Sequence, residues 1–167
     1  EKSEYPLELV RRLGELDLMT DGLDVPGHES MTSLGAGLAL MEVTRADASM
    51  GTVVAVQAGL AMRSIAMLGS EEQRSRYLPA MASCSLLGAF GLTEPLHGSD
   101  SIALETTAVR DGDSWVLNGE KKWIGNGASG GVTVIYARME DGNVGGFIVP
   151  QDAPGYSATV ITGKLSL

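Results

Sequence analysis

The sequence contains few of the residues on which disulfide, metal and nucleic-acid chemistry depends. A single cysteine, Cys84, excludes an internal disulfide and fits a reducing compartment. The two histidines, His28 and His97, are too far apart in the chain to form a recognisable metal-ligand motif, so no metal site is expected. Only 12 lysine and arginine residues stand against 21 aspartate and glutamate residues. This net charge of −9 disfavours nucleic acid and anionic membranes as partners.

Long apolar segments without charge are also missing. No window of eighteen residues is both apolar and uncharged, so the sequence predicts no segment that spans a membrane. The first six residues do not have the pattern of a secretory signal. With 44% hydrophobic and 20% charged residues, the composition is instead typical of a soluble globular protein with a buried core.

The first half of the chain has apolar residues at helical spacing. Four helices are predicted, at residues 6–18, 31–44, 48–68 and 70–82. Ser70 and Gln73 match a capping box at the start of the fourth helix. Pro79 lies inside that helix, and a kink or an early end is expected there.

The second half has short β-prone segments separated by glycine, asparagine and aspartate. Strands are predicted at residues 86–93, 105–110, 114–117, 121–124, 131–138, 144–149 and 158–161. The dipeptides 111–112 and 118–119 suit tight hairpin turns. Because no helix separates the strands, we expect an α+β protein. Its all-α N-terminal domain would span residues 1–84, followed by an antiparallel, barrel-like β domain at residues 85–167.

Two polar segments stand out in this second half. Residues 88–100 (GAFGLTEPLHGSD) take a strand into a proline turn and a Gly-Ser-Asp loop, and residues 118–127 (NGEKKWIGNG) surround a lone tryptophan. The glycines match no phosphate-loop or dinucleotide fingerprint. From these features alone, two binding loops beside one sheet and two ordinary hairpins with Trp123 in the core are equally good interpretations.

The order and spacing of these segments resemble a known family. Residues 88–100 are similar to the flavin-binding signature of acyl-CoA dehydrogenases, and residues 118–126 are similar to the second flavin loop of that family. The resemblance continues at residues 69–73, 77–79, 146–149 and 154–155. The branch that it resembles most comprises glutaryl-CoA dehydrogenases and their short-chain acyl-CoA oxidase relatives.

The resemblance implies FAD-dependent α,β-dehydrogenation of an acyl-CoA thioester to the trans-2-enoyl-CoA. It implies that FAD is bound by Phe90, Leu92, Thr93, Gly98, Ser99, Trp123, Ile124 and Gly125. In this assignment the first three residues line the isoalloxazine ring, the next two bind the pyrophosphate, and the last three lie against the ring. Ser99 and Thr52 are the residues expected to contact the substrate.

Two positions depart from the family pattern. Gly125 stands where many members carry threonine or serine, whereas the oxidase relatives also carry glycine. The electron acceptor is therefore open between an electron-transfer flavoprotein and O₂. Gly51 stands where glutaryl-CoA dehydrogenases place an arginine that pairs with the substrate carboxylate. A carboxylate in an apolar pocket without a cation is costly, so an uncharged short or medium acyl chain is expected.

In the family, the catalytic base is a glutamate of a C-terminal four-helix domain. We expect this chain to lack that domain, to be trimmed at its start, and to contain no catalytic residue, with Glu94 serving a structural role. Alone it would bind FAD weakly and expose an apolar face, whereas the whole enzyme would form a dimer or tetramer. It would be cytoplasmic in a bacterium, or mitochondrial or peroxisomal in a eukaryote. The alternative is a non-catalytic protein that binds a partner or a CoA ester.

Overall fold

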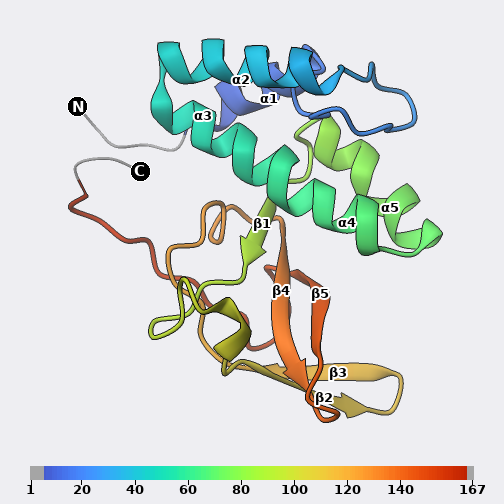
Figure 1. Cartoon of the computed structure of the whole chain (residues 1–167), viewed down its shortest axis with the longest axis vertical. Coiled ribbons are helices and arrows are strands. Elements are labelled where there is room, and N and C mark those ends of the chain that lie inside the picture. Colours follow the sequence, from blue (N-terminus) through green and yellow to red (C-terminus); the bar gives the residue numbers. More distant parts are fainter. Residues whose placement is uncertain (1–5, 165–167) are drawn as a thin grey trace.

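The computed structural model describes residues 6–164, in which a group of helices is followed by a small sheet. In Figure 1 the helices lie at the top, the strands lie below, and β1 leads from the helices into the sheet. This arrangement confirms the predicted α+β fold, with the helical part first. The expectations about where the chain begins and ends concern residues 1–5 and 165–167, which lie outside the described residues.

The helices occupy the segments that the sequence predicts. They are α1 (Leu7–Glu15), α2 (Ser33–Ala46), α3 (Ala48–Val54), the π-helical segment η1 (Ala55–Met62), α4 (Arg63–Leu68) and α5 (Glu71–Ala82). The third predicted helix is therefore a continuous run of α3, η1 and α4, and its π-helical middle was not predicted. Asp47 begins this run, because its carboxylate accepts hydrogen bonds from the backbone N–H groups of Ser49 and Met50.

The capping box at the start of α5 is confirmed. The Ser70 hydroxyl accepts a hydrogen bond from the Gln73 backbone N–H at 3.2 Å, and the Gln73 side chain accepts one from the Ser70 N–H at 2.8 Å. The early end at Pro79 is wrong, because the helix continues to Ala82. Leu78, Met81 and Ala82 are buried in the core, so their packing outweighs the one helical hydrogen bond that proline cannot donate.

The sheet contains β1 (Gly88–Gly91), β2 (Thr107–Asp111), β3 (Ser114–Asn118), β4 (Val132–Met139) and β5 (Val144–Pro150), with a short 3₁₀ turn η2 (Ser101–Ala103) before β2. The hairpins β2–β3 and β4–β5 are antiparallel, as predicted. However, β4 pairs in parallel with both β1 and β2, so the sheet is mixed. Strands that are distant in sequence make these parallel pairs, which local sequence patterns do not specify.

Two predicted strands are wrong. Residues 121–124 form a loop, because Trp123 has a φ of +62°, which a β-strand does not allow. Because no strand follows directly, the dipeptide 118–119 ends β3 without forming a hairpin. Residues 158–161 pair with no strand in the described part of the chain, and all four are exposed. Without a neighbouring strand or a buried face, their β-prone composition is not enough to form a strand.

A buried glutamine joins the helices to the sheet. Gln57 of η1 is fully buried, and its amide nitrogen donates hydrogen bonds to the backbone oxygens of Met81 and Leu86 at 2.8 and 3.0 Å. Its amide oxygen accepts one from the Gly88 N–H at 2.6 Å. A buried amide is tolerated here because these backbone groups satisfy both of its ends. Gln57 therefore fixes the position at which β1 leaves the end of α5.

The segment Ala48–Leu68 is, within residues 6–164, the one helix long and apolar enough by length and composition to cross a membrane. The core helix of a soluble protein passes the same criterion, and 44% of the apolar window is buried inside this fold. Arg63 on this helix also pairs with Asp21 at 2.7 Å. The segment is therefore weak evidence for a membrane span.

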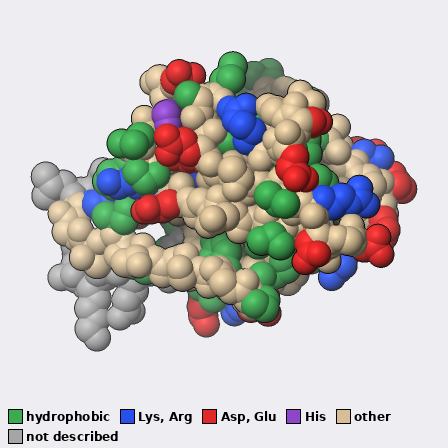
Figure 2. All heavy atoms as spheres, turned by 90° about the horizontal axis from the view of Figure 1, so that it is seen from below, with side chains coloured by type: hydrophobic (Ala, Val, Ile, Leu, Met, Phe, Trp, Pro, Cys, Tyr) green, Lys and Arg blue, Asp and Glu red, His purple; other side chains and the backbone are tan. Residues whose placement is uncertain are grey.

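The surface mixes charged and apolar side chains. Figure 2 views the molecule from below Figure 1 and shows acidic, basic and hydrophobic side chains interspersed on that face. On α2, Leu34, Leu38 and Met41 are exposed at helical spacing and form an apolar stripe.

Candidate functional site

The first candidate loop, residues 92–100, follows β1 directly. The Glu94 N–H donates a hydrogen bond to the His97 backbone oxygen at 3.0 Å, which closes a turn around Pro95. Beyond this turn Gly98 and Ser99 are exposed, whereas Thr93 is half-buried. The exposed Gly-Ser pair can therefore offer a hydroxyl and backbone N–H groups to a ligand.

The second candidate loop, residues 119–127, lies against the first. The Lys122 N–H donates a hydrogen bond to the Thr93 backbone oxygen at 2.9 Å, and the Lys121 ammonium donates to the Leu92 oxygen at 3.2 Å. Trp123 follows with its positive φ and a side chain that is 61% exposed. A bulky residue in this conformation is strained, and such strain is found where the surrounding contacts enforce it.

The far end of the second loop is tied to the sheet. The Asn126 side chain donates a hydrogen bond to the Gly88 backbone oxygen at 3.0 Å. The Gln151 side chain donates one to the Asn126 backbone oxygen at 2.8 Å. The Tyr156 hydroxyl donates to the Gly127 oxygen at 2.7 Å. The loop is thus fixed at both ends, and the exposed Trp123 lies between the two anchors.

A groove of about 1900 Å³ lies beside the second loop. Its walls include residues 114–117 of β3, residues 146–150 of β5 and the segment 153–161. Thr52 and Val56 line it from the helices. Val56 packs against Gly125, since a Cβ atom at Gly125 would lie 3.2 Å from a Val56 methyl carbon. The helical part and the second loop therefore meet at this groove.

The predicted site residues fall into two groups. Thr52, Trp123, Ile124 and Gly125 line the groove. Phe90, Leu92, Thr93, Gly98 and Ser99 are not among its lining residues and lie instead in β1 and the first loop. The hydrogen bonds from Lys121 and Lys122 connect the two groups.

Glu94 lies between the loops with its side chain buried. One carboxylate oxygen accepts hydrogen bonds from Lys121 Nζ at 2.7 Å, from Thr106 N at 2.9 Å and from the Thr106 hydroxyl at 2.5 Å. The other oxygen accepts from Glu105 N at 2.6 Å. Burial acts to raise the Glu94 pKa, but the bonds from Glu105, Lys121 and Thr106 outweigh it and lower the pKa to about 2. A carboxylate held this firmly is a poor base, so its structural role stays the prediction that these contacts favour.

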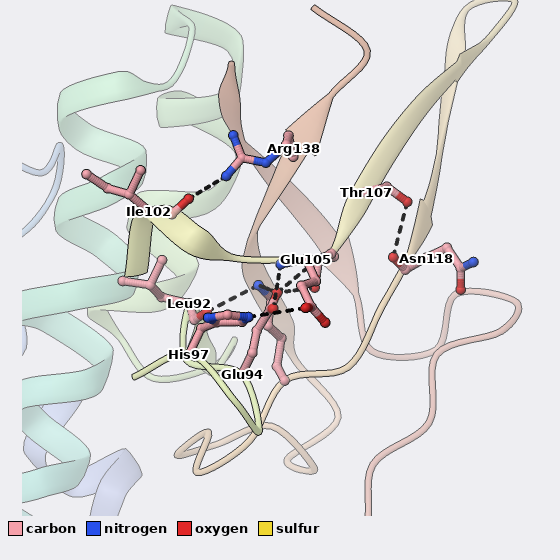
Figure 3. Close-up of polar contacts among 10 residues, drawn as sticks. Leu92, Glu94, His97, Ile102, Glu105, Thr107, Asn118 and Arg138 are labelled. Atoms are coloured by element: carbon pink, nitrogen blue, oxygen red, sulfur yellow. Dashed lines mark hydrogen bonds and ion pairs between the residues drawn. The ribbon is translucent and has the colours of Figure 1, made fainter. Parts of the chain in front are cut away.

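Glu94, His97 and Glu105 form a cluster, shown in Figure 3 between the first loop and the start of β2. Their ligand atoms lie within 4.8 Å of one another, a spacing that a metal ion can bridge. The Lys121 ammonium already occupies one side of the Glu94 carboxylate, and His97 Nε2 lies 3.3 Å from Glu105 Oε1. Hydrogen bonds hold Glu94 in this cluster, whereas the buried His97 Nε2 has no hydrogen-bond partner among the described residues. The absence of a metal site stays a prediction.

Several residues of the site were missed by the sequence. Lys121 was predicted within a strand and within the second motif, but it was given no role of its own. Thr106, Gln151 and Tyr156 were not singled out. The adjacent Lys121 and Lys122 within the second motif were a usable signal. A buried carboxylate such as that of Glu94 needs a charged partner, and these lysines are candidates for that partner. Nothing local marks Gln151 or Tyr156, because the partners of their side chains are at least 18 residues away.

Models of two protein domains match nearly the whole chain. Residues 1–85 match the N-terminal domain of acyl-CoA dehydrogenase, and residues 89–167 match its middle domain. The mitochondrial short-chain specific acyl-CoA dehydrogenase of Mus musculus is 35% identical over 98% of this chain and 41% of its own length. An acyl-CoA dehydrogenase of Bacillus subtilis is also 35% identical, over 98% of this chain and 45% of its own length.

A solved structure agrees with these matches. The glutaryl-CoA dehydrogenase of Mycobacterium smegmatis in complex with FADH₂ superposes with a TM-score of 0.93 and is 41% identical, over 96% of this chain and 42% of that one. The chain thus spans less than half the length of the curated relatives that it matches. Matches to both domain models, in order and over nearly every residue, identify the family. The chain belongs to the acyl-CoA dehydrogenase family.

Proposed function

We propose that this chain forms the flavin-binding part of an FAD-dependent enzyme that converts an acyl-CoA thioester to the trans-2-enoyl-CoA. The observation that carries this proposal is the pair of interlocked loops, with Trp123 exposed on the groove. The Mycobacterium smegmatis relative, whose structure is described as a complex with FADH₂, supports the choice of cofactor.

The donors in the two loops fit FAD. Gly98 has no heavy atom within 4 Å of the place where a Cβ would stand, so a ligand can approach its backbone closely. The exposed Ser99 hydroxyl and neighbouring N–H groups suit the oxygens of a pyrophosphate. Trp123 offers a flat, exposed apolar surface suited to an aromatic ring. When bound, FAD would supply the hydride acceptor, while these residues would orient its ring and exclude water.

The substrate in this proposal has an uncharged short or medium acyl chain. Gly51 is buried, and a Cβ atom there would lie 2.2 Å from the Thr44 hydroxyl oxygen, so Thr44 already fills the space that a longer side chain would need. Thr52 lines the groove beside the apolar residues Val53 and Val56. A distal carboxylate would find no fixed cation among these neighbours. Ser99 is the second candidate for contact with the substrate, through its CoA part.

The remaining parts of the enzyme belong to the same proposal. The base that removes the substrate α-proton would lie outside these 167 residues, and the whole protein would form a dimer or tetramer. Electrons would pass to an electron-transfer flavoprotein. Gly125, which removes a side-chain hydroxyl from the ring site, also favours a second candidate, an acyl-CoA oxidase that consumes O₂. We propose a bacterial cytoplasmic or a mitochondrial location, in line with the Bacillus and mouse relatives.

The flavin content of two variants of the full-length protein tests the proposed site. Ser99→Ala removes a proposed phosphate donor, and Trp123→Ala removes the surface proposed to cover the ring. Each variant should purify with clearly less FAD than the wild type. Ser75→Ala, an equivalent change on the exposed side of α5, serves as control and should keep the full flavin content. Unchanged flavin in both site variants would contradict the assignment.

A further inference from the structure

The Glu94–Lys121 ion pair is buried between the two candidate loops. Only 4% of the Glu94 side chain and 10% of the Lys121 side chain are exposed. Every hydrogen-bond partner of this pair among the described residues belongs to the loops or to their immediate continuation: Leu92 on the first loop, and Glu105 and Thr106 just before β2. The pair therefore links three segments that are far apart in the sequence.

Such an arrangement is an expensive way to stabilise a fold. Two charges lose their hydration on burial, and a well-packed apolar pair of similar volume is often as stable or more stable. What an ion pair with several directed hydrogen bonds adds is a fixed relative position of its partners. Here Thr93 precedes Glu94 and Lys122 follows Lys121, and these two neighbours are themselves bonded, N–H to oxygen, at 2.9 Å.

We propose that Glu94 and Lys121 are positioning residues that set the distance between the two loops for flavin binding. The inference rests on the proposed function, in which Thr93 and Ser99 of one loop and Trp123 of the other hold the same cofactor. Thr93 is one residue from Glu94, and Trp123 is two residues from Lys121. A shift of either loop would therefore move a contact on one side of the flavin and leave the other side unchanged.

The physical reason is preorganisation. A ligand held by two separate loops loses affinity when it must also order one loop relative to the other. Trp123 depends on this ordering in particular, because its φ of +62° is a conformation that the chain holds only when its surroundings enforce it. The anchor at Asn126 and Gly127 fixes one side of Trp123, and the Glu94–Lys121 pair fixes the other.

Neutral variants of the full-length holoenzyme test the proposal. Glu94→Gln and Lys121→Gln keep the approximate side-chain size and remove one charge each, whereas Glu140→Gln is the control. Glu140 is exposed in the turn between β4 and β5, away from both loops, so its substitution removes one charge without touching them. For each protein we would measure the FAD dissociation constant, the visible circular dichroism of the bound flavin, and the unfolding midpoint of the apoprotein.

We expect the FAD dissociation constant to rise about tenfold or more in Glu94→Gln and in Lys121→Gln, as loss of a hydrogen bond to a charged group implies. The double variant should lose less affinity than the sum of the two single losses. The dichroism of the bound flavin should change in both single variants. Glu140→Gln should match the wild type. Thr106→Val removes the hydroxyl bond to Glu94 and keeps the ion pair. It should weaken FAD binding by a smaller factor, about threefold. This variant covers the case in which the charge variants do not fold.

Two results would overturn the inference. One is an unchanged FAD dissociation constant in Glu94→Gln, Lys121→Gln and Thr106→Val. The other is a loss of affinity that only follows the loss of folded apoprotein, with the dichroism of the bound flavin unaltered. A wild-type protein that binds no FAD would instead contradict the proposed function itself, so the two failures are distinguishable.

Discussion

The Lys121 ammonium lies 2.7 Å from the Glu94 carboxylate, although 27 positions separate the two residues in the chain. This contact and the backbone N–H groups of Glu105 and Thr106 hold the Glu94 pKa near 2, against an ordinary value of 4.5. Because the folded pKa is below the unfolded one, ionised Glu94 stabilises the fold above about pH 4.5. That contribution is lost as the pH falls from 4.5 towards 2.

We therefore predict that Glu94→Gln changes the acid stability of the protein. The variant should unfold at a clearly lower temperature than the wild type at pH 7, and the difference should shrink as the pH is lowered from 4.5 to 2.5, where Glu94 begins to be protonated. Thermal unfolding midpoints over this pH range provide the measurement. Glu140→Gln, at an exposed position in the β4–β5 turn, is the control. Curves for the wild type and Glu94→Gln that stay parallel would show that Glu94 is not the titrating group.

The second prediction concerns the buried Gln57. Gln57→Leu keeps the size of the side chain but leaves the Gly88 N–H and the oxygens of Met81 and Leu86 without this partner. Unpaired buried polar groups cost about 1–3 kcal/mol each, so we expect destabilisation by roughly 3 kcal/mol or more. The unfolding midpoint in urea measures it.

The control for this prediction is another glutamine. Gln73→Ala removes one exposed half of the capping box, and its cost should be only about 1 kcal/mol. Equal effects of Gln57→Leu and Gln73→Ala would contradict the role given to Gln57 as the link between the helices and β1.

The third prediction separates folding from binding at two glycines. A Cβ atom at Gly88 would lie 2.3 Å from Met81 Cε and 2.8 Å from Ala61 Cβ, so Gly88→Ala should destabilise the protein by about 1–3 kcal/mol. A Cβ atom at Gly98 would meet no heavy atom of the protein within 4 Å. Gly98→Ala should leave the unfolding midpoint unchanged and weaken FAD binding, because the added methyl group would stand where we propose that the cofactor approaches. A Gly98→Ala protein with wild-type FAD affinity would remove Gly98 from the site.

The fourth prediction concerns the acyl chain. Gly51 is buried against Thr44, and Val53 and Val56 line the groove beside Thr52. An acyl chain with a distal carboxylate should therefore be a poor substrate of the full-length enzyme. The kcat/KM for butyryl-CoA should exceed that for glutaryl-CoA by about tenfold or more, since an unpaired charge in an apolar site is strongly disfavoured. A preference for glutaryl-CoA would contradict this prediction and would show that a cation, such as Lys122 or Lys164 on the wall of the groove, reaches the acyl chain.

The sequence predicted the helices well because each has a local signal. The capping box of Ser70 and Gln73 marks the start of α5, and Asp47 is a good N-cap for α3. Of the kink or early end expected at Pro79, the early end is wrong, because tertiary packing there outweighs a local helix breaker. The sequence also could not predict the parallel pairing of β1 and β2 with β4, which depends on contacts between distant segments.

The candidate site shows the same division. The two motifs locate both loops in the sequence. However, the residues around Trp123 have a strand-like local pattern, and only the contacts at each end of the loop enforce the positive φ of Trp123. The Glu94–Lys121 pair joins two motifs that the sequence treats separately. Its existence depends on the fold, so spacing along the chain does not reveal it.

The most direct test of the central claim is the visible absorption spectrum of the purified full-length protein, before and after butyryl-CoA is added without oxygen. We predict flavin absorption bands that correspond to about one FAD per subunit, and loss of the oxidised-flavin band near 450 nm when the acyl-CoA is added. A protein that binds no FAD even after incubation with the cofactor, or a bound flavin that acyl-CoA does not reduce, would contradict the account.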